Sequence, residues 1–241
     1  MVEREVEMVI SGDGSNTLFV PALSEHYHST FGAVAESMQV FIRNGFSCLA
    51  PALNSIHILE IGFGTGLNAF LTLIAAETAG KRVIYHALEP FPLEAEIWER
   101  LNYPALPGYT DFKSRFGELH RACWDRSVEI TPGFTLYKSQ VDLKHYLPPA
   151  GYFQLVYFDA FGPSVQPELW TEAVFSKLYK GLNPGGILTT YSVKGTVVRA
   201  VKDAGFTVEK LPGPPGKRHI MRATKELPLP HSDPHGICTT G

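Results

Sequence analysis

The stretch of the sequence with the most definite chemical character is a run of alternating glycines, Gly62, Gly64 and Gly66, preceded by Glu60. Glycines that follow a strand allow a sharp turn and let a ligand approach the backbone closely. The dinucleotide-binding fingerprint would need a glycine where the chain has Leu67, and the Gly-x4-Gly-Lys-Ser/Thr motif of NTPases does not occur. A carboxylate beside the loop suits a cation better than a pyrophosphate group. The loop therefore predicts S-adenosylmethionine as ligand, against another nucleotide or a plain tight turn.

Acceptor groups after the next predicted strands complete the expected cofactor site. Glu89 follows an apolar strand 29 residues after Glu60, where a carboxylate can accept hydrogen bonds from both ribose hydroxyls. In the loop after the next strand, Gln140 or Asp142 could accept from the exocyclic amine of adenine, and the sequence does not decide between them. The residues predicted to bind the cofactor are Glu60, Gly62, Phe63, Gly64, Gly66, Asn68, Glu89, Gln140 and Asp159.

A charged residue, Asp159, closes a strongly apolar strand over residues 153–158. Ligands bind at the carboxyl ends of strands in open α/β sheets, so Asp159 would face the reacting groups. Its carboxylate could accept a hydrogen bond from an incoming amine and help to take its proton, and Phe161 could stack on a flat acceptor. The competing interpretation is an ordinary turn or helix-cap aspartate. Asp159 and Phe161 are the predicted catalytic residues.

The rest of the pattern supplies the elements that must position these residues. From position 55 onward, strands are predicted over 56–61, 83–88, 153–158, 186–191, 206–211 and 219–223, and helices over 67–78 and 197–204. This alternation predicts a parallel sheet with helices on both faces. Before it, a β-hairpin is predicted over 6–10 and 17–20, and helical spacing extends over 32–43. We expect an N-terminal extension over 1–50, an α/β domain over 51–225 and a C-terminal tail over 226–241.

Length and composition exclude several classes of protein. Of the 241 residues, 44% are hydrophobic and 19% are charged, which excludes a disordered or fibrous chain. Neither a membrane-spanning run nor a signal peptide is expected from the distribution of apolar residues. The three widely spaced cysteines fit a reducing compartment, so a cytoplasmic location is expected. No spacing of histidine, cysteine and acidic residues indicates a metal site.

Charge is distributed unevenly, although the net charge of the chain is only −3. Residues 194–225 contain eight Lys or Arg against two acidic residues, whereas residues 1–193 carry a net charge of −7. Such a basic segment can contact phosphate groups, and it can equally be an ordinary solvated surface.

Four motifs together resemble the bacterial methyltransferases of the tRNA wobble uridine, of the MnmC type. They are residues 60–68 (EIGFGTGLN), residues 89–93 (EPFPL), residues 158–171 (FDAFGP and PELWT) and residues 203–218 (DAGF and GPPGKR). The glycine loop is common to many methyltransferases, but its combination with the last two motifs is much more specific. The resemblance extends from about residue 16 to residue 223 and includes residues 26–29 (HYHS) and 36–37 (ES).

The resemblance implies a class I methyltransferase fold, a mostly parallel seven-stranded sheet with an antiparallel last strand. It implies S-adenosylmethionine as donor, S-adenosylhomocysteine as product, and the aminomethyl nitrogen of 5-aminomethyl-(2-thio)uridine in the tRNA anticodon stem-loop as acceptor. Nothing in the 241 residues could be the flavin oxidoreductase half of the bifunctional relatives, so neither metal nor flavin is expected. A separate flavin oxidoreductase or the upstream wobble-uridine modification enzymes are the expected partners. The expected substrate-binding residues are Tyr27, Glu36, Lys194, Lys217 and Arg218, the last three through phosphate groups.

Two departures from the family pattern concern the predicted site. The family often has Gly-Asp where this chain has Ser139-Gln140, which puts the adenine contact there in doubt. The family often carries paired arginines after Lys194-Gly195, and here Val198 replaces the first and Arg199 is kept.

Two rival functions remain open from the sequence. One is a small-molecule amine methyltransferase or aminopropyltransferase, which the basic segment over 194–225 disfavours because a polyamine needs an acidic pocket. The other is a non-catalytic S-adenosylmethionine-binding domain associated with RNA, which the intact Glu60, Glu89 and Asp159 disfavour.

Overall fold

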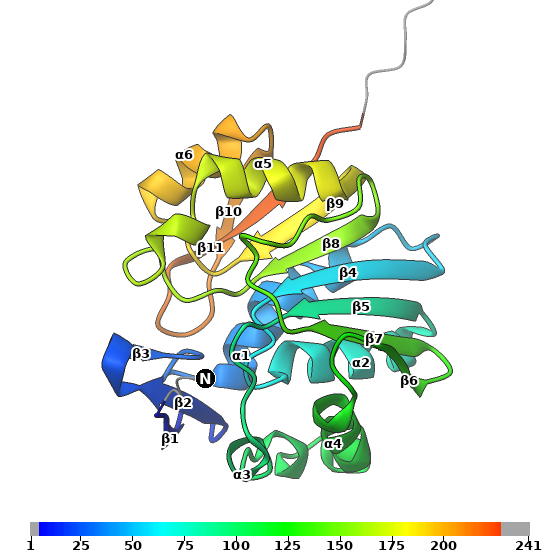
Figure 1. Ribbon diagram of the computed structural model, residues 1–241, viewed down its shortest axis with the longest axis vertical. Helices are drawn as coiled ribbons and strands as arrows, with labels where there is room; N and C mark the ends of the chain where they lie inside the picture. Colours follow the sequence, from blue (N-terminus) through cyan, green and yellow to red (C-terminus); the bar gives the residue numbers. More distant parts are fainter. Residues whose placement is uncertain (1–4, 228–241) are drawn as a thin grey trace, which may run out of the picture.

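The computed structural model describes residues 5–227, in which a small N-terminal sheet lies beside a larger α/β unit (Figure 1). The small sheet is antiparallel, in the order β1 (Glu7–Ile10), β2 (Asn16–Val20) and β3 (Glu25–His26). Gly14, in the turn between β1 and β2, has a φ of +83°, which glycine adopts without strain. The hairpin that the sequence predicts is present.

The predicted helical stretch over 32–43 forms α1 (Ala33–Ser37), followed directly by a π-helical segment (Met38–Arg43). Side chains of the β1–β2 turn accept hydrogen bonds from the first amides of α1: Asp13 Oδ2 accepts from Ala35 N at 2.8 Å and Ser11 Oγ from Ala33 N at 3.1 Å. These contacts satisfy helix amides that have no partner within the helix. The hairpin turn therefore fixes where the helix begins.

Within residues 5–227, the larger sheet has eight strands in the order β10-β11-β9-β8-β4-β5-β7-β6. The central strands pair in parallel, whereas β11 runs antiparallel to β9 and β10, and β6 runs antiparallel to β7. The mostly parallel sheet with an antiparallel last strand is confirmed, and β6 is an additional edge strand. The strands are β4 (Ser55–Ile61), β5 (Arg82–Leu88), β6 (Ser127–Thr131), β7 (Phe134–Ser139), β8 (Phe153–Phe158), β9 (Leu182–Thr190), β10 (Thr207–Pro212) and β11 (His219–Thr224).

Helices cover both faces of this sheet (Figure 1). On one face lie α1, α2 (Leu67–Ala79) and α4 (Lys113–Arg121), and on the other lie α5 (Glu172–Gly181) and α6 (Gly195–Asp203). Because successive strand residues point to opposite faces, Ile58 is buried in the core that contains α2, whereas Leu59 is buried in the core that contains α5. The remaining helical segments are short: α3 (Ala95–Trp98) and 3-10 turns at Pro21–Leu23, Phe46–Cys48, Tyr103–Ala105, Thr110–Phe112 and Pro167–Leu169.

Several features of the sequence have only partial structural counterparts. No helix among residues 5–227 is long and apolar enough to cross a membrane. The tail expected over 226–241 lies, from residue 228 onward, outside the described residues, and so does Cys238. Cys48 and Cys123 are free thiols at the surface.

Asn102 ties the N-terminal sheet to the α/β unit by hydrogen bonds in both directions. Its side-chain oxygen accepts from Asn16 N at 2.8 Å, and its backbone N–H donates to Asn16 Oδ1 at 2.8 Å. Its amide nitrogen also donates to the Gly14 carbonyl at 2.8 Å. The two parts of the chain also share one hydrophobic core, in which Phe41 and Phe70 are both buried.

We expect Asn102→Ala to lower the free energy of unfolding by about 1–3 kcal/mol, because it removes the side-chain partners of the Asn16 N–H and of the Gly14 carbonyl. Urea denaturation followed by circular dichroism measures this loss. Gln140→Ala, at an exposed position, is the control and should change stability by less than about 0.5 kcal/mol. Equal stability of the two variants would contradict a structural role for the Asn102 contacts.

Candidate active site

The carboxyl ends of the central strands border a cavity of about 330 Å³. Its walls come from the loops after β4, β5, β7 and β8, from residues 25–31 together with Glu36, and from residues 216–217 between β10 and β11. In Figure 1 the N-terminal sheet lies beside these strand ends, so it closes one side of the cavity. The fold thus brings together the segments that the sequence singled out for chemistry.

The glycine loop after β4 can form only with glycines at its turning points. Gly62 has a φ of +91°, and a Cβ atom there would lie 2.8 Å from the Asp159 carbonyl oxygen. Gly64 has a φ of +48°, and a Cβ atom there would lie 3.0 Å from the Tyr27 ring. Side chains at these positions would both strain the backbone and fill the space next to the cavity.

Glu89, at the end of β5, is held against the glycine loop by its own carboxylate. Oε2 accepts from Gly64 N and Oε1 accepts from Phe91 N, both at 2.9 Å. The residue is buried but still lines the cavity. Backbone donors therefore fix the direction of this carboxylate at the edge of the cavity.

Two carboxyl groups meet beneath the cavity, bridged by a single amide. Asn68, in the first turn of α2, donates from Nδ2 to Glu60 Oε1 at 3.0 Å and to Asp159 Oδ2 at 2.8 Å. Adjacent strands bring these acids together, because β4 and β8 pair in parallel with Ile61 opposite Phe158. Glu60 Oε2 and Asn68 Oδ1 are buried without a hydrogen-bond partner in the described structure. The bridge thus orients Asp159 toward the cavity.

Burial shapes the protonation of both acids. Burial and the nearby carboxylate of Asp159 hold the pKa of Glu60 well above its usual range, although the hydrogen bond from Asn68 opposes this. Burial and the negative charge of Glu36 raise the pKa of Asp159 to about 7, against the lowering effects of Asn68 and Lys217. At neutral pH, Asp159 can therefore both hold and release a proton.

The N-terminal segment contributes an aromatic and an imidazole wall. The Tyr27 ring meets the Phe161 ring edge-on, with centroids 5.2 Å apart. His28 Nε2 lies 2.8 Å from Thr65 Oγ1 in the glycine loop, and burial lowers the pKa of His28 to about 4. His28 is thus neutral at pH 7 and serves to bind the loop to the N-terminal sheet.

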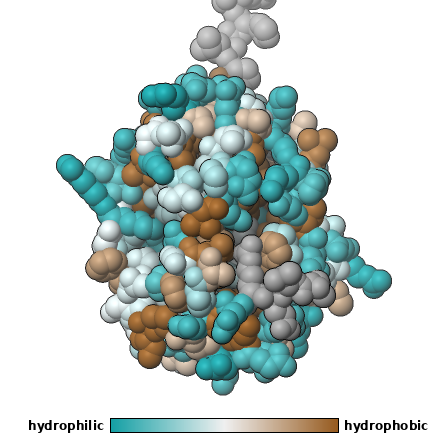
Figure 2. Space-filling view, turned by 60° about the vertical axis from the view of Figure 1, so that its left-hand side comes forward, coloured by the Kyte–Doolittle hydropathy of each residue, from teal (hydrophilic) through white to brown (hydrophobic). Residues whose placement is uncertain are grey.

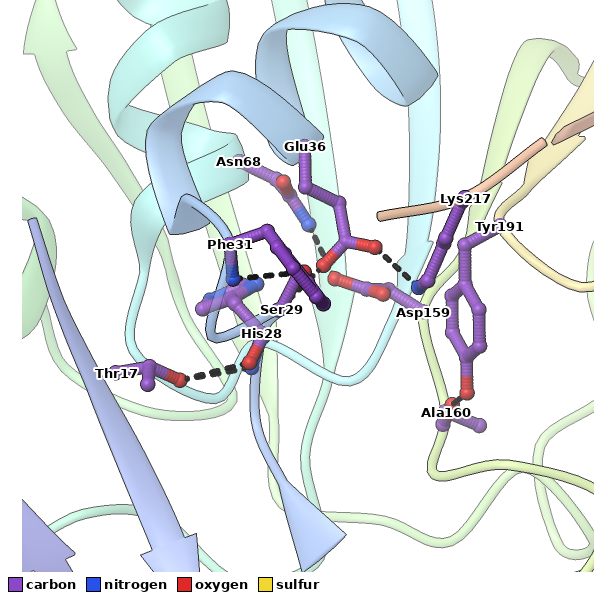
Figure 3. Close-up of polar contacts among 10 residues, drawn as sticks. All are labelled: Thr17, His28, Ser29, Phe31, Glu36, Asn68, Asp159, Ala160, Tyr191 and Lys217. Carbon is purple, nitrogen blue, oxygen red and sulfur yellow. Dashed lines mark hydrogen bonds and ion pairs between the residues drawn. The ribbon is translucent and has the colours of Figure 1, made fainter. Parts of the chain in front are cut away.

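A cation from the β10–β11 loop reaches into the same cavity (Figure 3). The Lys217 ammonium forms an ion pair with the buried carboxylate of Glu36 and lies 4.0 Å from the centre of the Tyr191 ring. The other oxygen of Glu36 accepts from Ser29 N at 2.7 Å, and Tyr191 donates to the Ala160 carbonyl at 2.9 Å. Lys217 is therefore held in the cavity by groups that are themselves fixed.

The predicted cofactor-binding residues divide into two sets. Those that line the cavity are Gly62, Phe63, Gly64, Glu89 and Asp159. Those that do not are Glu60, Gly66, Asn68 and Gln140. Glu60 lies within β4, and its side chain points toward the face of the sheet that α2 covers, where it accepts from Asn68. Gly66 is the N-cap of α2.

The open choice between Gln140 and Asp142 has a geometric outcome. Gln140 is exposed to solvent one residue after β7, whereas Val141 and Asp142 line the cavity. The prediction that Gln140 faces the cofactor cavity is therefore wrong, and Asp142 is the member of the pair that does.

The predicted substrate-binding and catalytic residues are also split. Tyr27, Glu36, Phe161 and Lys217 line the cavity with Asp159. Lys194 and Arg218 are exposed and lie outside its lining. The ammonium of Lys217 is paired with Glu36, and its contact with phosphate stays a prediction.

Sequence reasoning missed other residues of the site. Tyr191 follows β9 and lines the cavity under Lys217, and Trp170 donates from Nε1 to the Phe161 carbonyl at 2.8 Å. Trp170 belongs to the PELWT motif, which contributed to the family resemblance but did not predict a role for this residue. Among residues 5–227, no three His, Cys, Asp or Glu side chains gather so that they could hold a metal ion.

Comparison with known proteins gives consistent matches. A family model described as S-adenosyl-L-methionine-dependent methyltransferase matches residues 131–226. The "tRNA 5-methylaminomethyl-2-thiouridine biosynthesis bifunctional protein MnmC" of Magnetococcus marinus is 32% identical over 89% of this chain and 33% of that protein. The protein of the same name from Chromobacterium violaceum is 31% identical over 80% of the chain and 31% of its own length. The chain thus spans about a third of the length of these curated relatives.

Solved structures agree with the sequence matches. The crystal structure of MNMC2 from Aquifex aeolicus superposes with a TM-score of 0.78 and 27% identity, over 95% of this chain and 73% of that one. Spermidine synthase from Thermotoga maritima has a TM-score of 0.57 at 13% identity, over 94% and 71%, and shares the fold alone. The sheet order, the glycine loop and these matches define an S-adenosylmethionine-dependent methyltransferase fold. The chain is similar to MnmC proteins over 80–89% of its length and to the Aquifex aeolicus structure over 95% of it.

We expect Gly64→Ala to lower the affinity for S-adenosylmethionine by about tenfold or more, because the added methyl group narrows the cavity beside Tyr27. Gly80→Ala, at the other end of α2, is the matched control: its φ is +62°, but nothing lies within 4 Å of the added Cβ. Both variants strain the backbone, so only Gly64→Ala should change binding in isothermal titration calorimetry. Equal affinities of the two variants for S-adenosylmethionine would contradict the assignment of the glycine loop to the cofactor site.

Proposed function

We propose that the protein transfers a methyl group from S-adenosylmethionine to the amino nitrogen of 5-aminomethyl-(2-thio)uridine at the wobble position of tRNA. The observation that carries the proposal is the Asp159 carboxylate, which lines the cavity at the end of β8 and is oriented by Asn68. The substrate class is supported by the names of the relatives, which refer to tRNA 5-methylaminomethyl-2-thiouridine biosynthesis. A tRNA substrate also agrees with the expected cytoplasmic location.

The residues around the cavity fit the chemical groups of S-adenosylmethionine. Glu89 would accept hydrogen bonds from the ribose hydroxyls, since its carboxylate is already aimed by two backbone N–H groups. Asp142 would accept from the adenine amine, in place of Gln140. Gly62 and Gly64 would leave room for the methionine portion. Glu60 would act through Asn68 rather than on the cofactor.

The bound cofactor would supply an electrophilic methyl group on a sulfonium. The acceptor amine must lose its proton before or as its lone pair forms the new N–C bond, while the S–C bond breaks and S-adenosylhomocysteine leaves. Asp159 has a pKa raised to about 7, which suits a general base near neutral pH. Its hydrogen bond from Asn68 holds the carboxylate in one direction, and positioning of the two reactants supplies most of the acceleration.

The surface around the cavity offers groups suited to RNA. Phe31 and Phe91 line the cavity and are 62% and 43% exposed, so their rings can meet nucleobases near the target. The exposed Lys194 and Arg218 would contact phosphate groups. Figure 2 shows hydrophobic and hydrophilic side chains intermixed over the face that it displays.

An aminopropyltransferase is the second candidate, because spermidine synthase from Thermotoga maritima shares the fold. At 13% identity this likeness concerns the fold alone. A domain without catalytic activity is the third. A methyltransferase labels its acceptor from methyl-labelled S-adenosylmethionine. An aminopropyltransferase would instead label a polyamine from decarboxylated S-adenosylmethionine labelled in the aminopropyl chain, with methylthioadenosine as the leaving group, and a domain without catalytic activity would label neither.

We expect methyl transfer to tRNA that carries 5-aminomethyl-(2-thio)uridine, and none to unmodified tRNA or putrescine. Asp159→Asn keeps the shape of the side chain but removes its charge, so the single-turnover rate should fall by a factor on the order of 10². Asp203→Asn, at the exposed end of α6, is the control and should keep the wild-type rate. Methylation of putrescine alone, or a wild-type rate for Asp159→Asn, would refute this assignment.

A further inference from the structure

The cavity holds an ammonium group that belongs to the chain itself. The Lys217 ammonium pairs with Glu36, whose side chain is only 6% exposed, and lies over the face of the Tyr191 ring. A carboxylate and an aromatic face are the two features that bind organic cations in proteins. Figure 3 shows Lys217, Glu36 and Asp159 turned toward one another from different elements.

Backbone hydrogen bonds close the β10–β11 loop, which places the neighbouring side chains of Lys217 and Arg218 in different surroundings. Gly213 N donates to the Arg218 carbonyl at 3.1 Å, and Lys217 N donates to the Pro214 carbonyl at 3.0 Å. Arg218 is exposed, whereas Lys217 lines the cavity. The ordered β10–β11 loop therefore places the ammonium of Lys217 in the cavity.

Carboxylates outnumber cationic groups around Lys217 in the cavity. Glu36 and Asp159 both act on this space, and Glu25 also lines the cavity, whereas His28 is neutral at pH 7. Lys217 lowers the pKa of Asp159 while Glu36 raises it, so these groups respond to one another's charge. One ammonium does not neutralise these carboxylates, and removing it would leave Glu36 buried without its cation.

We propose that Glu36, Asp159 and Tyr191 form a subsite for a primary ammonium group, which the Lys217 ammonium fills until the acceptor amine displaces it. The identity of the displacing amine rests on the proposed function, whereas the subsite itself does not. A primary ammonium on a flexible stem and a protonated aminomethyl group present the same charge and donors. Lys217 would thus shield the two carboxylates in the free protein and leave as the acceptor enters.

Removing Lys217 should open the subsite to a small amine. We expect ethylammonium chloride to raise the melting temperature of Lys217→Ala saturably, with an apparent affinity about tenfold or more above that for the wild type. Sodium chloride at equal ionic strength should not reproduce this effect. Lys217→Met, which fills the same space without charge, and the double variant Lys217→Ala/Glu36→Gln should both lack the response. Lys202→Ala, at an exposed position of α6, should behave as the wild type.

The inference is overturned if Lys217→Ala responds to ethylammonium no more than to sodium chloride, or if Lys217→Met responds equally. Circular dichroism establishes that each variant folds, and Lys217→Ser takes the place of Lys217→Ala should the latter fail to fold. The titration contains neither S-adenosylmethionine nor RNA. Its failure is therefore distinct from failure of the proposed function, which the labelled methyl-transfer assay detects on the wild-type protein.

Discussion

The active-site architecture depends on one amide, that of Asn68, which donates to Glu60 and to Asp159 across the ends of two adjacent strands. Because Glu60 and Asp159 share one donor, their carboxylates would repel one another if both were ionised. Burial makes ionisation of each carboxyl group still more costly. The bridge offsets part of this cost and fixes the side chain of Asp159 at the cavity. Helix α2, which begins directly after the glycine loop, carries the bridge, so the loop, the helix and both acids are positioned as one unit.

The rest of the cavity continues the same electrostatic pattern. Glu89 is turned inward by backbone donors, Glu36 is held by Ser29, and the ammonium of Lys217 lies among the acids. A cavity with this excess of carboxylates favours cationic ligands, which is the charge of a sulfonium cofactor and of an amine acceptor. The N-terminal segment matters here because Tyr27, which follows β3, and Glu36, in α1, both line the cavity.

Much of this arrangement could be predicted from the sequence because the signals are local. Alternation of strands and helices predicted the α/β fold, and the glycine loop, Glu89 and Asp159 each follow a strand whose carboxyl end faces ligand. The position of Lys217 could not be predicted, since its partner Glu36 lies 181 residues away in the sequence. Gln140 and Asp142 lie two residues apart in the loop after β7, and the sequence does not predict the path of this loop, which places Asp142 at the cavity and leaves Gln140 exposed. Tyr191 and the edge strand β6 gave no motif that distinguishes them from ordinary core and surface residues.

The measurement that tests the account most directly is proton release when S-adenosylmethionine binds, obtained by calorimetry at pH 7 in buffers of different ionisation enthalpy. The pKa of Asp159 is about 7 in the free protein, and a sulfonium beside the carboxylate would lower it, so a proton must leave. We predict release of up to about half a proton per bound molecule, because Asp159 is then about half protonated in the free protein. Asp159→Asn should abolish the release. Binding without proton release, or the same release from Asp159→Asn, would contradict the claim that Asp159 faces the reacting centre.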